Sequence, residues 1–194
     1  MDTSKTKHLF NYTNTVLLLI LLVVLSRLVP HMHNFSPLGA ISLFGAAYFL
    51  KKWQAFIVPI IAVWISDLFI NNIIYSYMFP TFSLFYDGFF WQYSSYLLIT
   101  LGGIFILKKI NLSRIITASL FSSVSFFLVS NFGFWISSPF YTKDLNGLFT
   151  CYVAAIPFIK GTLIGDAIFS SVMFGSFYLL QQKFSHLKTI SINK

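Results

Sequence analysis

The stretch TVLLLILLVVLSRLVPHMHNFSPLGAISLFGAAYFL, residues 15–50, contains two apolar runs separated by one arginine, two histidines, one asparagine and two prolines. A helix needs about 20 apolar residues to cross a hydrocarbon layer of about 30 Å. The first segment, residues 13–29, comes close to that length, whereas the second, residues 36–50, is short. The stretch therefore predicts a helical membrane protein. It also raises a question: is the segment from Arg27 to Pro37 an ordinary turn or the rim of a site?

The composition of the whole chain supports a membrane location. Of the 194 residues, 57% are hydrophobic and only 9% are charged, which excludes an ordinary soluble domain. We expect an all-α bundle of six transmembrane helices in one domain, residues 13–182, with tails at 1–12 and 183–194. The second helix is expected to be short or re-entrant, and Pro157 to kink or divide the sixth. The six apolar segments are residues 13–29, 36–50, 53–73, 89–107, 113–135 and 151–182.

The start of the chain has two possible interpretations. Lys5 and Lys7 precede an apolar core, as in a signal peptide. No small-x-small cleavage site follows, and Arg27 stands where the cut would fall. We therefore interpret this segment as an uncleaved first transmembrane helix.

Basic residues predict the orientation of the chain in a bacterial inner membrane. If the N-terminus is cytoplasmic, ten of the 13 basic residues lie on the cytoplasmic side, as the positive-inside rule requires. Both termini are then cytoplasmic, and the aromatic loops 74–88 and 136–150 face outwards. The cations are scattered and form no stripe, which argues against nucleic acid as a partner. The ten residues are Lys5, Lys7, Lys51, Lys52, Lys108, Lys109, Arg114, Lys183, Lys188 and Lys194.

Polar residues of four segments are predicted to share one depth. At a rise of 1.5 Å per residue, all four come out at roughly 21–25 Å from the cytoplasmic surface. Charged groups at membrane depth usually pair with each other or face a wet cavity. The four residues are Arg27, Asp67, Asn131 and Asp166, and His31, His33, Asn34 and Lys160 lie slightly further out.

This polar level allows two interpretations, a ligand cavity or a structural ion-pair clasp. Arg27 is expected to pair with Asp67 or Asp166, and Lys160 with the other aspartate. In a cavity, Arg27 and Lys160 would neutralise acidic ligand groups or hold the two aspartates ready. Asn131, Asn34 and His31 would orient the ligand, and Trp135 could stack on a planar one.

A metal site is a further alternative. His31 and His33 with Asp67 could bind a metal in an intramembrane enzyme, and Cys151 is a weak candidate for a soft metal. The sequence identifies no cofactor. A structural subunit of a larger membrane complex remains a third possibility. We favour transport over catalysis, because no Gly-rich phosphate loop, nucleophile elbow or metalloprotease helix is present.

Four segments together resemble a bacterial family of small integral membrane proteins that carries a domain-of-unknown-function label and is sometimes described as a transport family. The resemblance covers most of residues 13–182. The segments are RLVPHMHNFSPLGAISLFGAAYF (27–49), SD (66–67), SNFGFW (130–135) and GLFTCYVAAIPFIKGTLIGDAIFS (147–170).

More distantly, the predicted architecture is similar to the S components of energy-coupling factor vitamin transporters. This likeness implies capture of a vitamin-like small molecule from the outer face. It also implies an energising transporter module as a partner. The first helix, however, reads VLLLILLVVL (16–25) and lacks the Ala-x-x-x-Ala pattern through which S components dock, whereas the second segment is rich in glycine and alanine.

Overall fold

The computed structural model describes residues 3–29, 34–78 and 81–192, and within these ranges the chain is helical with no strand. Five elements are long and apolar enough to cross a membrane, namely α1, α3 with its π-helical extension η2, α4, α5 and α6. The prediction of an all-α membrane protein is thus confirmed. The elements are α1 (Thr3–Leu25), η1 (Ser26–Leu28), α2 (Leu38–Tyr48), α3 (Lys52–Phe69), η2 (Ile70–Ile74), η3 (Ser76–Met78), α4 (Phe89–Ile106), α5 (Leu112–Ser137), α6 (Leu145–Lys183) and α7 (Ser185–Ile192).

The second predicted segment, α2, differs from the other five. It has 11 residues, about 16 Å of helix, and is too short to cross a hydrocarbon layer of about 30 Å. Every one of its residues is buried. The predicted set of six membrane helices therefore becomes five candidate spans and one short internal helix.

Small side chains explain how α2 can be enclosed by the other helices. It contacts α1, α3, α4, α5 and α6. On its α4 side, a Cβ added to Gly103 would lie 2.9 Å from the Cβ of Ala46, closer than real Cβ contacts come. Small residues at such contacts let helix backbones approach closely, as in other membrane bundles.

The last long helix, α6, is continuous, so of the two predicted effects of Pro157, a kink or a division, the division is wrong. It contains 39 residues, including Pro157, and is about 58 Å long, well beyond one membrane thickness. Asp144 caps its start by accepting a hydrogen bond of 2.7 Å from the Gly147 amide. That bond, together with one from Thr142, lowers the pKa of Asp144 below its usual value.

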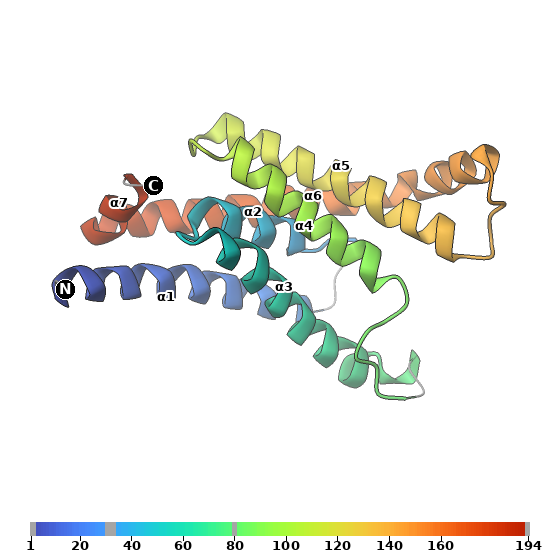
Figure 1. Cartoon of the computed structure of the whole chain (residues 1–194), viewed down its shortest axis with the longest axis horizontal. Coiled ribbons are helices and arrows are strands. Elements are labelled where there is room, and N and C mark those ends of the chain that lie inside the picture. The colour runs from blue at the N-terminus through green and yellow to red at the C-terminus, as the bar shows by residue number, and fades with distance from the viewer. Residues whose placement is uncertain (1–2, 30–33, 79–80, 193–194) are drawn as a thin grey trace.

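Figure 1 shows the two ends of the bundle, and the sequence makes them chemically different. One end, here called the basic end, holds both chain termini and the α2–α3 and α4–α5 connections; the α3–α4 and α5–α6 loops form the other, the loop end. The end of α1 and the start of α2 lie partway along the bundle. Basic residues of the first end are Lys51, Lys52, Lys108, Lys109, Arg114, Lys183 and Lys188.

The half of the core nearer the basic end is packed with aromatic rings. Tyr48 of α2 lies 4.2 Å from Phe177 of α6 between ring centroids, and Phe44 contacts both Phe174 and Phe177. The Tyr12 hydroxyl donates a 3.1 Å hydrogen bond to the Tyr48 carbonyl. These five residues, the aromatic plug, are all buried.

The outer faces of the long helices carry large apolar side chains. Leu18 is 55% exposed, Ile65 57% and Phe105 60%, and many neighbours on the same faces are similar. Apolar surface of this extent is not tolerated in water by a monomeric protein. Together with the five candidate spans, it indicates that the protein is embedded in a membrane.

Candidate functional site

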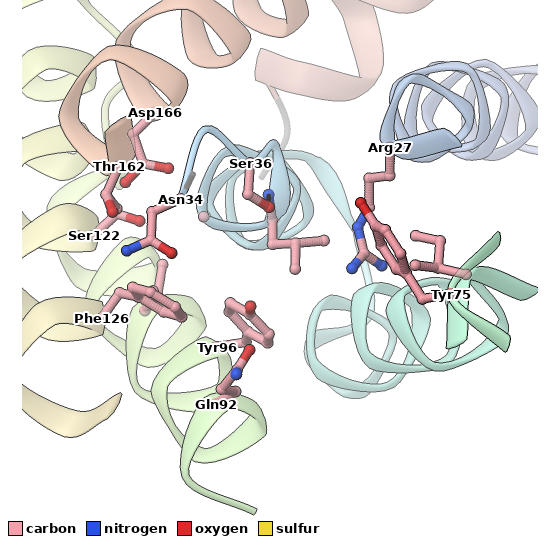
Figure 2. A pocket seen from close by; sticks show the side chains of 14 residues that line it. Arg27, Asn34, Ser36, Tyr75, Gln92, Tyr96, Ser122, Phe126, Thr162 and Asp166 are labelled. Atoms are coloured by element: carbon pink, nitrogen blue, oxygen red, sulfur yellow. Dashed lines mark hydrogen bonds between the residues drawn. The ribbon is translucent and has the colours of Figure 1, made fainter. Parts of the chain in front are cut away.

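A cavity of about 220 Å³ lies at the first turn of α2, between α4, α5, α6 and the ends of α1 and α3 (Figure 2). Arg27 and Tyr75 border one side, and Asp166, Thr162 and Ser122 border the opposite side. Tyr96 and Phe126 form part of the wall, with ring planes 12° apart and centroids 5.9 Å apart. Further lining residues are Asn34, Ser36, Leu38, Gly39, Ile70, Gln92 and Ile99.

Arg27 is positioned by the end of the first helix. The α-helix tightens into the 3-10 turn η1, where the Ser26 hydroxyl donates to the Val23 carbonyl at 2.7 Å. Val29 is extended, with φ −88° and ψ 130°. It precedes Pro30, whose ring disfavours a helical conformation in the residue before it. The helix therefore ends here, inside the bundle, with Arg27 turned towards α3 (Figure 2).

Arg27 and Asp67 form an ion pair in which both partners are surrounded by polar groups. The Arg27 Nη2 atom lies 2.6 Å from Asp67 Oδ1, and the exposed fractions of the two side chains are 13% and 9%. Arg27 Nη1 donates to the Ser66 hydroxyl. Tyr93 donates to the other carboxylate oxygen of Asp67 at 2.7 Å. Of the two predicted partners for Arg27, the structure selects Asp67.

Asp166 is the second buried carboxylate, and it is 1% exposed. The Ser123 hydroxyl donates to its Oδ2 atom at 2.8 Å. The Ser122 hydroxyl is buried on the same side of the cavity (Figure 2); it forms no hydrogen bond of ordinary geometry among the described residues, but it lies near enough to Asp166 to interact with the carboxylate, as does the Ala40 amide. A Cβ added to Gly39 would stand 2.1 Å from Ser122 Oγ and 2.2 Å from Asp166 Oδ1. Only glycine at this position leaves room for the carboxylate.

The Asp166 carboxylate thus lies against the first turn of α2. Pro37, at the N-cap position, provides no side-chain hydrogen bond to the helix. The first turn of a helix has unpaired amide groups and a partial positive charge, which stabilises a nearby anion. Asp166 supplies that anion from α6.

A second hollow of about 200 Å³ adjoins the cavity and shares Asn34, Gln92, Phe126 and Thr162 with it. Asn131 lines this second hollow and donates to the Phe127 carbonyl at 2.7 Å. Asn34 is exposed and adopts a positive φ of 57°, a left-handed conformation that asparagine tolerates better than most residues. It therefore stands at the border of both spaces.

Two predicted site residues lie away from the cavity. Lys160 is exposed and forms no ion pair with Asp166, so the predicted Lys160–Asp166 pair is wrong. Trp135 belongs to the loop end, where its Nε1 donates to the Thr142 carbonyl at 2.8 Å and Lys143 donates to its carbonyl.

The structure gives no support to a metal centre among the residues it describes. No group of three His, Cys, Asp or Glu side chains is close enough to bind a metal there. Cys151 is buried, and its thiol donates to the Asn131 carbonyl at 3.6 Å. His31 and His33, the two predicted histidines, lie outside the described residues.

The sequence analysis did not identify several residues in or next to the cavity, because they are uncharged. Ser122 and Ser123 occur in α5 with Ser119, and these three serines are buried. Their spacing of three and four residues places them on one face of an apolar helix. This polar face could have been recognised from the sequence. Gly39, Thr162 and Tyr93 had no comparable signal, because small or aromatic residues are common in any membrane helix.

Comparison with known proteins gives one family. A family described as "Family of unknown function (DUF6580)" matches residues 7–187. No curated protein and no solved structure matches the chain.

Proposed function

We propose that this chain, which belongs to the family of unknown function DUF6580, binds a small polar solute in the cavity at the start of α2 and serves in its uptake across the membrane. One observation carries the proposal: two separate buried ionic centres, Arg27 with Asp67 and Asp166 with its serines, border one cavity. A charged side chain at the centre of a membrane helix costs about 2.5–3.5 kcal/mol on insertion scales. A purely structural bundle has little reason to place charge beside empty space.

The predicted orientation gives the solute a route. By the positive-inside rule, the basic end faces the cytoplasm and the loop end faces outwards. Two lining residues, Asn34 and Tyr75, are exposed and mark the opening of the cavity to the surface. Towards the basic end, the aromatic plug packs against α2 and α6, and a separate hollow of about 510 Å³, lined among others by Ala46 and Lys108, shares no lining residue with the cavity. In our proposal, this conformation therefore receives the solute from the outer side.

Within the cavity, the residues supply a mixed environment that suits a small organic molecule. Binding pockets typically combine apolar walls with a few fixed polar groups. Here Phe126, Ile99 and Leu38 provide the apolar part, and Gln92, Thr162 and Asp166 provide hydrogen-bonding groups. Release inwards then requires the aromatic plug to move, since it closes the path.

The resemblance to S components suggests an energising module as the cause of that movement, and the structure limits how such a module could dock. The glycine- and alanine-rich helix α2 is enclosed on all sides and presents no surface to a partner. The exposed face of α1 carries large residues, including Leu18, Leu21 and Leu22. A partner would therefore contact leucine-rich helix surface instead of a small-residue groove.

The proposal is tested by mass spectrometry of small molecules extracted from gently purified protein. Thr162→Phe fills the boundary between the two hollows, whereas Thr150→Phe makes the same change at an exposed position of the same helix. We expect a small molecule to be retained by the wild type and by Thr150→Phe and lost from Thr162→Phe. A wild-type protein that retains nothing, or equal retention by all three proteins, contradicts the proposal.

A further inference from the structure

We propose that the solute carries a positively charged organic group and that Asp166 binds this group; the inference rests on the proposed function. The argument follows from which charges in the cavity are already balanced by the protein and which are not.

Arg27 is the obvious group for an anionic solute, but the chain already balances its charge. Its guanidinium contacts Asp67 at 2.6 Å and also donates to Ser66 and, at 3.4 Å, to the Val63 carbonyl. A buried guanidinium and carboxylate in such close contact behave as a neutral unit, and separating them leaves both charges unpaired. An anionic solute would have to compete with Asp67 for Arg27.

The first turn of α2 is the second place where an anion would be expected to bind. In several transporter folds, short helices inside the membrane point their N-termini at acidic groups of the substrate. In this protein, Asp166 lies there instead, close enough that even a methyl group on Gly39 would collide with it. Both anion-binding features of the cavity are therefore occupied by aspartates of the chain itself.

The charged side chains at the cavity give it a net negative charge. Arg27 and Asp67 cancel, whereas Asp166 contributes one negative charge, of which the helix end offsets about half a unit. Among the described residues, no lysine or arginine forms an ion pair with Asp166. A buried carboxylate without a full counter-charge is costly, and a cationic solute removes that cost.

The surroundings of Asp166 suit an ammonium-type group in particular. Ser122 Oγ is buried beside the carboxylate and lines the cavity, and even while its hydroxyl donates to Asp166 its oxygen can accept a hydrogen bond from the solute. The rings of Phe126 and Tyr96 border the same space (Figure 2). Aromatic faces attract organic cations, and this attraction strengthens away from water.

The test uses detergent-purified full-length protein and measures the thermal unfolding midpoint, Tm. The probes are three pools of metabolites from the host cell, separated by ion exchange into cationic, neutral and anionic fractions, with sodium and potassium chloride as inorganic controls. Two variants are compared with the wild type. Asp166→Asn removes the buried charge with little change in shape, and Asp87→Asn makes the same change at an exposed loop position.

We expect the cationic pool to raise the Tm of the wild type and of Asp87→Asn by about 5 °C, as a ligand well above its dissociation constant does. The rise should be absent for Asp166→Asn, whose helical circular dichroism and monodispersity report whether it has folded. The wild-type comparison between pools stands even if that variant fails to fold.

Other results would overturn the inference in distinguishable ways. Stabilisation by the neutral or anionic pool alone refutes a cationic solute but keeps the proposed function. Stabilisation by sodium or potassium chloride alone shows that the bound cation is inorganic and also refutes the inference. An equal rise for folded Asp166→Asn removes Asp166 from the site. No rise in any pool contradicts the proposed function itself.

Discussion

Asp67 and Asp166 are both buried carboxylates on long apolar helices, yet the protein surrounds them differently. Asp67 has a guanidinium on one oxygen and the Tyr93 hydroxyl on the other. Asp166 has neutral donors only, namely the Ser123 and Ser122 hydroxyls and the Ala40 amide of the α2 helix end, and it adjoins a cavity. Asp67 is therefore fully satisfied by its neighbours, whereas Asp166 faces space that is still available to a ligand.

This difference separates two roles that the sequence could not tell apart, a structural ion pair and a ligand-binding carboxylate. A closed ion pair orders the packing of α1 against α3 and has little left to offer a solute. A carboxylate beside a cavity adds little to packing and keeps its binding capacity. Substitutions at the first centre should consequently change stability, and substitutions at the second should change binding.

The largest effect is expected from Asp67→Leu. Removing one partner of a buried pair leaves Arg27 unpaired, which typically costs about 3–5 kcal/mol. The free energy of unfolding in detergent measures this loss. The double variant Arg27→Met with Asp67→Leu should recover most of it, because replacing a whole buried pair with apolar groups is often neutral. A double variant as unstable as the single one would show that the pair is not a self-contained unit.

Gly39→Ala should come next, at about 2 kcal/mol, because the added methyl overpacks the contact between α2 and Asp166. The stabilisation by the cationic metabolite pool should be lost as well. Gly175→Ala is the matched control: nothing lies within 4 Å of its added Cβ, and it should be neutral or slightly stabilising. Equal stability of the two variants would mean that the space at Gly39 is not restricted.

Tyr93→Phe tests whether the hydrogen bond to Asp67 affects stability and not solute binding. It removes one hydrogen bond to a charged group, worth about 1.5 kcal/mol. Because neither Tyr93 nor Asp67 lines the cavity, the Tm rise caused by the cationic pool should remain. Chemical denaturation and the ligand-dependent Tm shift measure the two quantities separately. Loss of the shift at unchanged stability would place Tyr93 at the binding site instead.

The smallest effect on stability is expected from Ser122→Ala. Its hydroxyl forms no hydrogen bond of ordinary geometry and interacts only weakly with Asp166, so removing it should leave the unfolding free energy within about 1 kcal/mol of the wild type. Solute affinity should fall about 5- to 10-fold, the effect of one hydrogen bond. Titration of the purified cationic solute provides the measurement. Unchanged affinity would exclude this hydroxyl from solute binding.

Apolar segments were the most predictable part of this protein. Long hydrophobic runs separated by basic residues specify helices that span a lipid layer, and this information is local to each run. The length of α6 was underestimated because its start, Leu145 to Thr150, contains polar residues and is set by the Asp144 cap. The helix continues through Pro157, although the sequence alone suggested a break there.

The candidate site was only partly predictable. The predicted depths of Arg27, Asp67 and Asp166 in the membrane are similar. In the structure, Arg27 and Asp166 border one cavity. Depth says nothing about the direction in which a side chain points around its helix. Lys160 therefore entered the predicted set, although it is exposed. The uncharged residues at Gly39, Ser122 and Thr162 did not enter it, because their significance depends on neighbours from other helices.

From the amino-acid sequence alone, three properties could be predicted: the chain belongs in a membrane, its apolar segments are helical, and a few ionisable groups lie deep within those segments. These properties follow from hydrophobicity and from the cost of unpaired backbone groups in lipid, both of which act segment by segment. Only the tertiary structure decided that α2 is enclosed, that Arg27 pairs with Asp67, and that Asp166 faces a cavity. Those outcomes depend on how five helices pack around a sixth, and packing is a property of shapes that meet only when the chain is folded.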